Sequence, residues 1–201
     1  SRLRNQGFDT FFLMVNYKAE MISSYFSSGS SFGVRIEYFE EQTKRGTAGP
    51  LSSLREHVDE PFVVMNADVL TSLDFKKLMD YHKTMKSDLT LALKSFKRKI
   101  AYGVIDLSPD SVITGIREKP TLSFLINSGI YVVSPETLRL IPDEGVFQMT
   151  ELIEAAKDDG LNVIGYEFSE PWRDIGRIDD YMKTISDLES GEESDADGVF
   201  I

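Results

Sequence analysis

The sequence predicts an α/β fold with a mainly parallel, partly mixed sheet flanked by helices. Strand and helix patterns alternate over the first 95 residues, which implies parallel strands joined by right-handed crossovers. Successive strand patterns follow from residue 102 and make the second half of the sheet mixed. The first half is organised around Pro61–Met65, a short apolar segment that we expect to be a strand buried on both faces.

Each element of the first half has its own signal. Gly7 ends a helical pattern, Pro50 suits the first turn of a helix, and Asp74 can cap another. The expected elements are the end of a helix at 1–7, a strand at 10–15, a helix at 18–26, a strand at 33–39, a helix at 50–58, the strand at 61–66, a helix at 74–85 and a strand at 89–93. Because a domain seldom begins in the last turns of a helix, we expect a further segment to precede residue 1.

The second half changes character. Its expected elements are strands at 102–107, 111–117 and 125–133, a helix at 150–157, a strand at 162–168 and an amphipathic helix at 177–188. Ser134 and Pro135 form a helix cap and a first helical position, and Gly160 ends a helix. We therefore expect one domain over residues 1–188, with a nucleotide-binding half at about 1–95 and an acceptor-binding half at about 96–188. We expect residues 189–201 to be an acidic tail or linker.

Composition excludes several classes of protein. A chain of 201 residues with 41% hydrophobic and 27% charged residues is typical of one globular domain. Its apolar runs are too short to span a bilayer, and no signal-peptide pattern opens it. Cysteine is absent, which excludes disulfides, thiolate metal sites and cysteine nucleophiles and fits the cytoplasm. His57 and His82 lie on helical patterns and are interpreted as packing or surface residues rather than ligands.

Charge argues against a nucleic-acid-binding protein. The net charge is −11, whereas sequence-independent binding to nucleic acid needs a basic surface. Six acidic residues without a balancing cation follow Lys183, and without them the net charge is −5. A polyanionic substrate would therefore need local cations or a bound metal ion. The basic run Lys97–Lys99 is interpreted as a solvated turn.

Two carboxylates are candidate metal ligands. Asp68 stands just past the 61–66 strand, where open α/β sheets bind their ligands, although alone it is more readily the cap of the next turn. Asp174, in the segment Trp172–Gly176, is either a second ligand that reaches toward Asp68 or the cap of the helix that follows. If both hold one ion, their carboxylates must lie within roughly 8 Å of each other.

The segment Arg45-Gly46-Thr47-Ala48-Gly49-Pro50 lies between a strand and a helix. Its glycines let the backbone approach a ligand closely, and a helix N-terminus favours an anion or a polar ligand edge. The alternative is an ordinary turn. Glu41, at the end of the preceding strand, could accept two hydrogen bonds from one ligand edge or be an ordinary loop charge.

Polar residues of the second half also allow two interpretations. Lys119 can meet a phosphate and Glu118 can accept sugar hydroxyls, or Arg117–Pro120 is an exposed charged turn. Asn127 interrupts an apolar strand and therefore needs a hydrogen-bond partner. Gly129, two residues later, indicates a bulge or a close approach of another segment.

Six short motifs occur in a specific order. They are Glu41 with Gly46-Thr47-Ala48-Gly49, Asn66-Ala67-Asp68-Val69-Leu70, Tyr102-Gly103-Val104, Glu118-Lys119-Pro120, Asn127-Ser128-Gly129-Ile130-Tyr131 and Trp172-x-Asp174-Ile175-Gly176. Together they resemble the sugar-1-phosphate nucleotidyltransferases, or nucleoside-diphosphate-sugar pyrophosphorylases, over roughly residues 1–188. Each motif is loose alone, and the ordered set is specific.

This resemblance implies a Rossmann-like, GT-A-like domain that transfers a nucleotidyl group from a nucleoside triphosphate to a sugar 1-phosphate and releases pyrophosphate. Such a displacement depends mostly on positioning and electrostatics, with Mg²⁺ screening the phosphate charge. On this mapping Asp68 and Asp174 hold Mg²⁺ and act with Lys119, which contacts the sugar phosphate. The other implied residues are Glu41, Gly46, Thr47 and Asn66 for the nucleotide, and Gly103, Glu118 and Asn127 for the sugar.

Two departures from the family pattern stand out. The family's opening strand and its loop G-x-G-T-R…P-K-P, which binds the triphosphate, would precede residue 1, so we expect residues 1–201 alone to show little or no activity. Arg45 stands where the family usually has Leu and adds a cation near the nucleotide. The alternatives are a catalytically silent sugar-nucleotide-binding or regulatory module and a glycosyltransferase of related fold. A homo-oligomer is also allowed for.

Hydrogen-bond chemistry predicts which nucleotide base the protein prefers. Guanine presents two N–H donors side by side, which one carboxylate can accept together, whereas a uracil or thymine edge suits an amide. Glu41 therefore favours GTP, although a shift of one residue would put the amide of Gln42 in its place. The 61–66 strand is also expected to border an open gap, where the family's first strand belongs.

Overall fold

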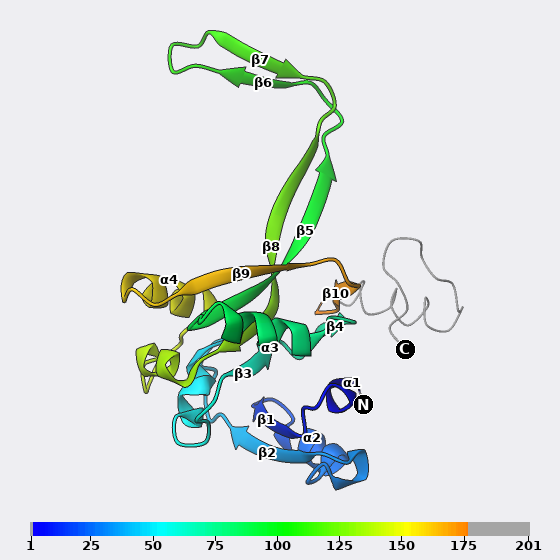
Figure 1. The fold of residues 1–201 in the computed structure, drawn as a ribbon, viewed down its shortest axis with the longest axis vertical. Coiled ribbons are helices and arrows are strands. Elements are labelled where there is room, and N and C mark those ends of the chain that lie inside the picture. Colours follow the sequence, from blue (N-terminus) through cyan, green and yellow to red (C-terminus); the bar gives the residue numbers. More distant parts are fainter. Residues whose placement is uncertain (1, 177–201) are drawn as a thin grey trace, which may run out of the picture.

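The computed structural model describes residues 2–176, so the helix expected at 177–188 and the tail at 189–201 lie outside the described residues (Figure 1). The helices are α1 (Arg2–Asn5), α2 (Ala19–Phe26), α3 (Phe75–Thr84) and α4 (Met149–Asp158), with 3₁₀ helices η1 (Ser30–Phe32), η2 (Gly49–Leu54) and η3 (Pro135–Leu140). None of the helices described here is long and apolar enough to cross a bilayer. Where a helix was expected at 50–58, the structure has the shorter 3₁₀ helix η2.

Strands fill most of the remaining described chain. They are β1 (Thr10–Val15), β2 (Arg35–Glu40), β3 (Phe62–Met65), β4 (Val69–Thr71), β5 (Leu89–Lys99), β6 (Val104–Leu107), β7 (Ile113–Arg117), β8 (Thr121–Val133), β9 (Val163–Phe168) and β10 (Trp172–Asp174). The central sheet has the order β3–β8–β5–β9, and β1–β2, β4–β10 and β6–β7 form separate pairs. Only β1–β2 and β5–β9 are parallel among the described pairs. The mixed α/β fold is confirmed, with more antiparallel pairing than expected because β8 runs against both of its neighbours.

Strand β8 lies at the centre of the core. Successive residues of a strand face opposite sides of a sheet, and the last four residues of β8 divide in this way between two apolar clusters. Tyr131 and Val133 pack with η2, η3 and α4 on one face, whereas Ile130 and Val132 pack with α3 on the other. All four are at most 3% exposed. This double burial explains why the segment is continuously apolar.

Strand β3 is less buried than its sequence suggests. Its residues are half-buried, and Met65 is 36% exposed, so the expected burial on both faces is wrong. One edge pairs with β8, while beside the strand lies an apolar pocket of about 670 Å³ that β1 and α2 also line. No described strand joins β1 to β3. The expected gap beside this strand is therefore present.

Strands β5 and β8 continue beyond the body as a two-stranded arm that ends in the β6–β7 hairpin (Figure 1). In the arm, residues Ser95–Lys99 of β5 pair with residues Thr121–Leu125 of β8 in antiparallel register. Lys97–Lys99 is therefore the end of β5 and not the expected turn. Both faces of the arm are largely solvated, and the charged run Lys97–Lys99 of β5 has no apolar alternation that would reveal a strand.

His82 is a buried core histidine, as its helical spacing indicated. Its Nδ1 lies 2.8 Å from Thr90 Oγ1 and its Nε2 lies 3.1 Å from Ser134 Oγ, and the residue is 1% exposed. Burial lowers the pKa of the imidazole, against a smaller raising effect of Asp88. The ring therefore stays neutral and bridges α3 to the central sheet.

Acid should weaken the fold through His82. The unfolded chain binds a proton near the ordinary pKa of 6.5, but the folded chain binds it only at lower pH. The His82 contribution to the free energy of unfolding is thus complete above about pH 6.5 and falls as the pH drops below that value. Urea unfolding of the wild type and of His82→Gln between about pH 8 and pH 5 measures this. A difference between the two proteins that does not change with pH would contradict the assignment.

Candidate functional site

The pairing of β4 with β10 brings two aspartates together. In this antiparallel pair Asp174 lies opposite Val69, the residue that follows Asp68. The Ile175 N–H donates to the backbone oxygen of Asp68 at 2.8 Å and fixes the register beyond the end of β10. Two positions more than 100 residues apart therefore become neighbours at one strand end.

Gly176 measures how close the two carboxylates are. A Cβ on Gly176 would lie 2.7 Å from Asp68 Oδ2 and 3.1 Å from Asp174 Oδ1. Two oxygens at these distances from one point are at most about 6 Å apart, which is within the limit of roughly 8 Å expected for two carboxylates that share an ion. Two oxygens bound to the same Mg²⁺ are at most about 4 Å apart. The Gly176 N–H also donates to Asp174 Oδ1 at 2.8 Å. The absence of a side chain at Gly176 is what leaves room for both carboxylates.

The pair has the donor chemistry that Mg²⁺ takes. This ion uses one or two carboxylates and fills its other positions with water and substrate phosphate oxygens. No third histidine or acidic residue joins the pair among residues 2–176. The two aspartates can therefore hold an ion that keeps open positions for a ligand.

Two residues of the β8 interruption, Ser128 and Gly129, support this corner. The Asn66 N–H donates to Gly129 O at 2.9 Å, and a Cβ on Gly129 would lie 2.8 Å from Asn66 Nδ2. Gly129 has a φ of 73°, so the close approach expected from its sequence is real. The Trp172 indole N–H donates to Ser128 O at 2.9 Å. The end of β3 and the start of β10 are thus both held by one segment of β8.

Asn127 has the partners that its position in an apolar strand required. Its Nδ2 donates to the Tyr131 hydroxyl at 2.7 Å, and its Oδ1 accepts the Gly129 N–H at 3.1 Å. Burial raises the pKa of Tyr131, so the hydroxyl stays protonated near neutral pH. The side chain of Asn127 therefore organises the irregular stretch between Asn127 and Tyr131, where the pairing of β8 with β5 shifts register.

The glycine loop is held by a distant segment of the chain. The Ala48 and Gly49 N–H groups donate to Phe147 O at 3.0 and 2.9 Å, and the Thr47 N–H donates to Gln148 Oε1 at 3.2 Å. A Cβ on Gly46, whose φ is 83°, would lie 2.6 Å from Phe147 O. The expected close approach is thus to this protein's own backbone, and these three amides are already occupied.

Gly103, Glu118 and Lys119 meet at the junction between the arm and the β6–β7 hairpin. A Cβ on Gly103 would lie 3.2 Å from Glu118 Oε2, and Lys119 Nζ lies 3.9 Å from Glu118 Oε1. Both charged side chains are largely exposed. The six residue-to-residue steps from Thr121 to Asn127 alone span about 20 Å of strand, so this group lies far from Asn127.

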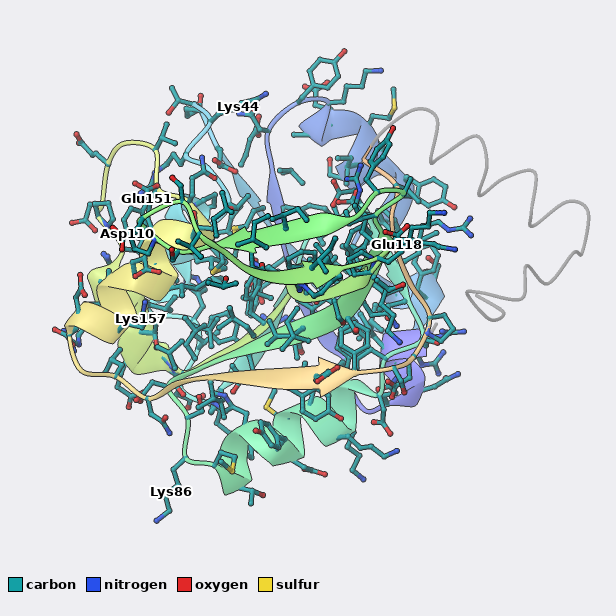
Figure 2. All side chains as sticks on the ribbon, turned by 90° about the horizontal axis from the view of Figure 1, so that it is seen from above. Lys44, Lys86, Asp110, Glu118, Glu151 and Lys157 are labelled. Carbon is teal, nitrogen blue, oxygen red and sulfur yellow. The ribbon has the colours of Figure 1, made fainter. Side chains whose placement is uncertain are left out.

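The residues expected to share one site are thus in three places. Asp68, Asp174 and Asn66 lie at the β4–β10 corner, whereas the glycine loop lies on the side of α4, opposite β4 and β10 in Figure 1. In Figure 2, Lys44 and Glu151 mark the loop side, and Glu118 lies on the opposite side. The resemblance implies one site for all these residues, and within residues 2–176 the structure does not bring the nucleotide and sugar motifs beside the carboxylates. Their roles stay predictions.

Comparisons with known proteins identify relatives over most of the chain. The family described as nucleotidyl transferase matches residues 1–191. UTP–glucose-1-phosphate uridylyltransferase of Synechocystis is 32% identical over 94% of this chain and 54% of its own length. Mannose-1-phosphate guanylyltransferase of Mycobacterium tuberculosis is 29% identical, with 95% and 55% covered. The chain thus spans about half the length of these two relatives.

A shorter relative is covered more completely. D-glycero-alpha-D-manno-heptose 1-phosphate guanylyltransferase of Aneurinibacillus thermoaerophilus is 32% identical over 93% of this chain and 81% of its own length. Among solved structures, HddC from Yersinia pseudotuberculosis has a TM-score of 0.70 at 24% identity, with 93% of this chain and 82% of that chain covered. At that identity the structural likeness supports the fold alone.

Replacing Gly46 by Ala should destabilise the glycine loop more than the same change at Gly145. Both glycines have a positive φ, so each variant should lose about 1 kcal/mol to backbone strain. Nothing lies within 4 Å of a Cβ on Gly145, whereas the one on Gly46 meets Phe147 O. We expect Gly46→Ala to cost at least about 1 kcal/mol more. Equal free energies of unfolding in urea for Gly46→Ala and Gly145→Ala would show that the contact with Phe147 O adds no cost to the Gly46 substitution.

Proposed function

The chain belongs to the nucleotidyl transferase family, and from this premise we propose that the protein transfers a nucleotidyl group from GTP to a sugar 1-phosphate with Mg²⁺. The observation that carries the proposal is the convergence of Asp68 and Asp174 around Gly176. Family membership supports the reaction class, since relatives named above are uridylyl- and guanylyltransferases of sugar 1-phosphates. Cytoplasmic location and a homo-oligomeric state stay predictions.

The reaction is a displacement at phosphorus. An oxygen of the sugar phosphate attacks the α-phosphorus of the triphosphate, a new P–O bond forms, and the bond to the leaving pyrophosphate breaks. When bound, Mg²⁺ would neutralise charge on the phosphate oxygens. Asp68 and Asp174 would hold it, and their placement at adjoining ends of the paired strands β4 and β10 fixes the separation of the two carboxylates. Preorganised charge of this kind lowers the barrier without reorganisation during the reaction.

Glu41 is the proposed reader of the base. Its backbone is anchored at both ends, because its N–H donates to Val15 O at 2.8 Å and its carbonyl accepts from Asn16 Nδ2 at 2.6 Å. One carboxylate oxygen accepts the Arg45 N–H at 3.0 Å. The other can accept a donor of guanine, and each oxygen has two lone pairs. Gly46, Thr47 and Asn66 complete the proposed nucleotide contacts.

Lys119, Glu118, Gly103 and Asn127 are the proposed sugar-phosphate contacts. Lys119 would meet the phosphate as a point charge, and Glu118 would accept sugar hydroxyls. Because Gly103, Glu118 and Lys119 lie at the far end of the arm, a sugar phosphate held by Lys119 and the carboxylates together would require the arm to bend toward β10.

Removing either carboxylate should weaken metal binding. Asp68→Asn and Asp174→Asn each replace a charged ligand by a neutral one, so we expect Mn²⁺ to bind at least about tenfold more weakly to each. Asp110→Asn, in the exposed turn of the β6–β7 hairpin, is the matched control and should bind as the wild type does. Electron paramagnetic resonance of free Mn²⁺ gives the affinities. Wild-type affinity in both site variants would remove the metal assignment.

The choice of base is tested by pyrophosphate release from the full-length gene product with Mg²⁺. Each nucleoside triphosphate is supplied in turn with a panel of sugar 1-phosphates. We expect GTP to give the highest kcat/KM, because only guanine offers two adjacent donors to Glu41. A preference for UTP or dTTP would contradict the role of Glu41. The same assay on residues 1–201 tests the expectation of little or no turnover by that chain.

A further inference from the structure

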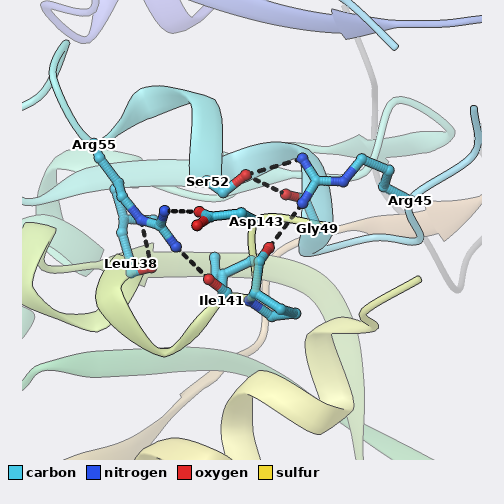
Figure 3. Close-up of polar contacts among 8 residues, drawn as sticks. Arg45, Gly49, Ser52, Arg55, Leu138, Ile141 and Asp143 are labelled. Carbon is cyan, nitrogen blue, oxygen red and sulfur yellow. Dashed lines mark hydrogen bonds and ion pairs between the residues drawn. The ribbon is translucent and has the colours of Figure 1, made fainter. Parts of the chain in front are cut away.

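Arg45 joins the glycine loop to two other segments (Figure 3). Its Nη1 donates to Ser52 Oγ at 3.0 Å, and its Nη2 donates to Pro142 O at 2.8 Å. The Ser52 hydroxyl in turn donates to Gly49 O at 2.9 Å. One guanidinium thus ties the loop to η2 and to the segment after η3.

Arg55 strengthens the same junction from the other side. Its guanidinium donates to the backbone oxygens of Leu138 and Ile141 and pairs with Asp143 (Figure 3). The segment from Leu138 to Asp143 is therefore held against η2 by one arginine and against the glycine loop by the other. Arg45 is the link that reaches the loop itself.

Burial of the Arg45 side chain is not fully compensated. Its Nε is buried without a hydrogen-bond partner, and within residues 2–176 it has no ion-pair partner. A buried donor without an acceptor weakens the fold, and an apolar side chain of similar size would avoid this cost. We therefore attribute the role of the guanidinium to its other two nitrogens, which hold Ser52 and Pro142 in fixed positions.

The backbone of Arg45 is also hydrogen-bonded to the carboxylate of Glu41. The Arg45 N–H donates to Glu41 Oε2, and the Arg45 carbonyl accepts the Phe147 N–H at 2.9 Å. The backbone of Arg45 is thus placed between the carboxylate and the segment that holds the loop. Since Pro142 O fixes the side chain of the same residue, a shift at Pro142 or Arg45 would turn the carboxylate of Glu41.

We propose that Arg45 is a positioning residue for base selection, which acts by holding Glu41 and the glycine loop in one conformation. The proposal rests on the proposed role of Glu41 as the reader of guanine. Arg45 itself need not touch the nucleotide. Its effect is preorganisation, because a carboxylate that is already oriented loses less freedom when it accepts the two donors of the base.

The test compares Arg45→Leu, Arg45→Lys and Ser52→Ala with Arg139→Leu in the 201-residue chain. Arg139 is the matched control, since it bonds Asp159 on the surface and makes no contact with the loop. Amide hydrogen exchange reports on the Ala48, Gly49 and Phe147 N–H groups. Calorimetric titration with GMP and with UMP reports on base selection.

We expect Arg45→Leu to speed exchange at these three amides by at least tenfold relative to Arg139→Leu. The ratio of GMP to UMP affinity should fall several-fold, with Arg45→Lys and Ser52→Ala in between. Arg139→Leu should leave the ratio unchanged. The proposal would be overturned if the wild type prefers GMP and Arg45→Leu exchanges faster but keeps the wild-type ratio of GMP to UMP affinity, because Arg45 would then be merely structural. Unchanged amide exchange in Arg45→Leu would also overturn it.

Failure of the proposed function gives a different result. A wild type that binds GMP and UMP equally would refute the guanine preference of Glu41. Arg45 would then have no role in base selection and the proposal would be overturned, whereas faster exchange in Arg45→Leu would still show that Arg45 holds the loop. The wild-type ratio thus tests the function, and the variant ratio tests Arg45.

Discussion

The pairing of β8 with both β3 and β5 is the interaction on which the described fold depends. The last four residues of β8 bury alternate side chains in two apolar clusters. The Asn127–Gly129 interruption of β8 accepts hydrogen bonds from Asn66, just past β3, and from Trp172 of β10. Because the same strand builds the core and anchors both strand ends, the separation of Asp68 and Asp174 is set by packing rather than by the aspartates themselves. Two like charges so close together repel, and a cation between them would relieve that repulsion.

Much of the fold follows from local patterns. Elements with clear apolar periodicity, such as β1, α2 and α3, have nearly the expected bounds. The patterns fail where burial depends on neighbours. The arm was missed because charged residues such as Lys97–Lys99 can form an exposed ladder without alternation, and β3 was expected to be fully buried because a sequence does not show which strand stands beside it.

The candidate site divides in the same way. The proximity of Asp68 and Asp174 was expected, because the family resemblance assigns both carboxylates to one ion. The short antiparallel pair β4–β10 that brings them together was not expected, since three-residue strands leave little pattern in a sequence. The true neighbour of Gly46 could not be predicted, since Phe147 is about 100 residues away and nothing in either segment indicates the other. Arg45 was visible only as a departure from the family pattern. Its hydrogen bonds to Ser52 and Pro142 give that departure a physical role.

The central claim is that Asp68 and Asp174 share one divalent cation. A crystal of the protein grown or soaked with Mn²⁺ and measured at the manganese absorption edge tests this directly. The account predicts one anomalous peak between the two carboxylates, with an oxygen of each at about 2.0–2.3 Å from the metal. A peak bound by only one of them, or no peak at the β4–β10 corner at saturating Mn²⁺, would contradict it.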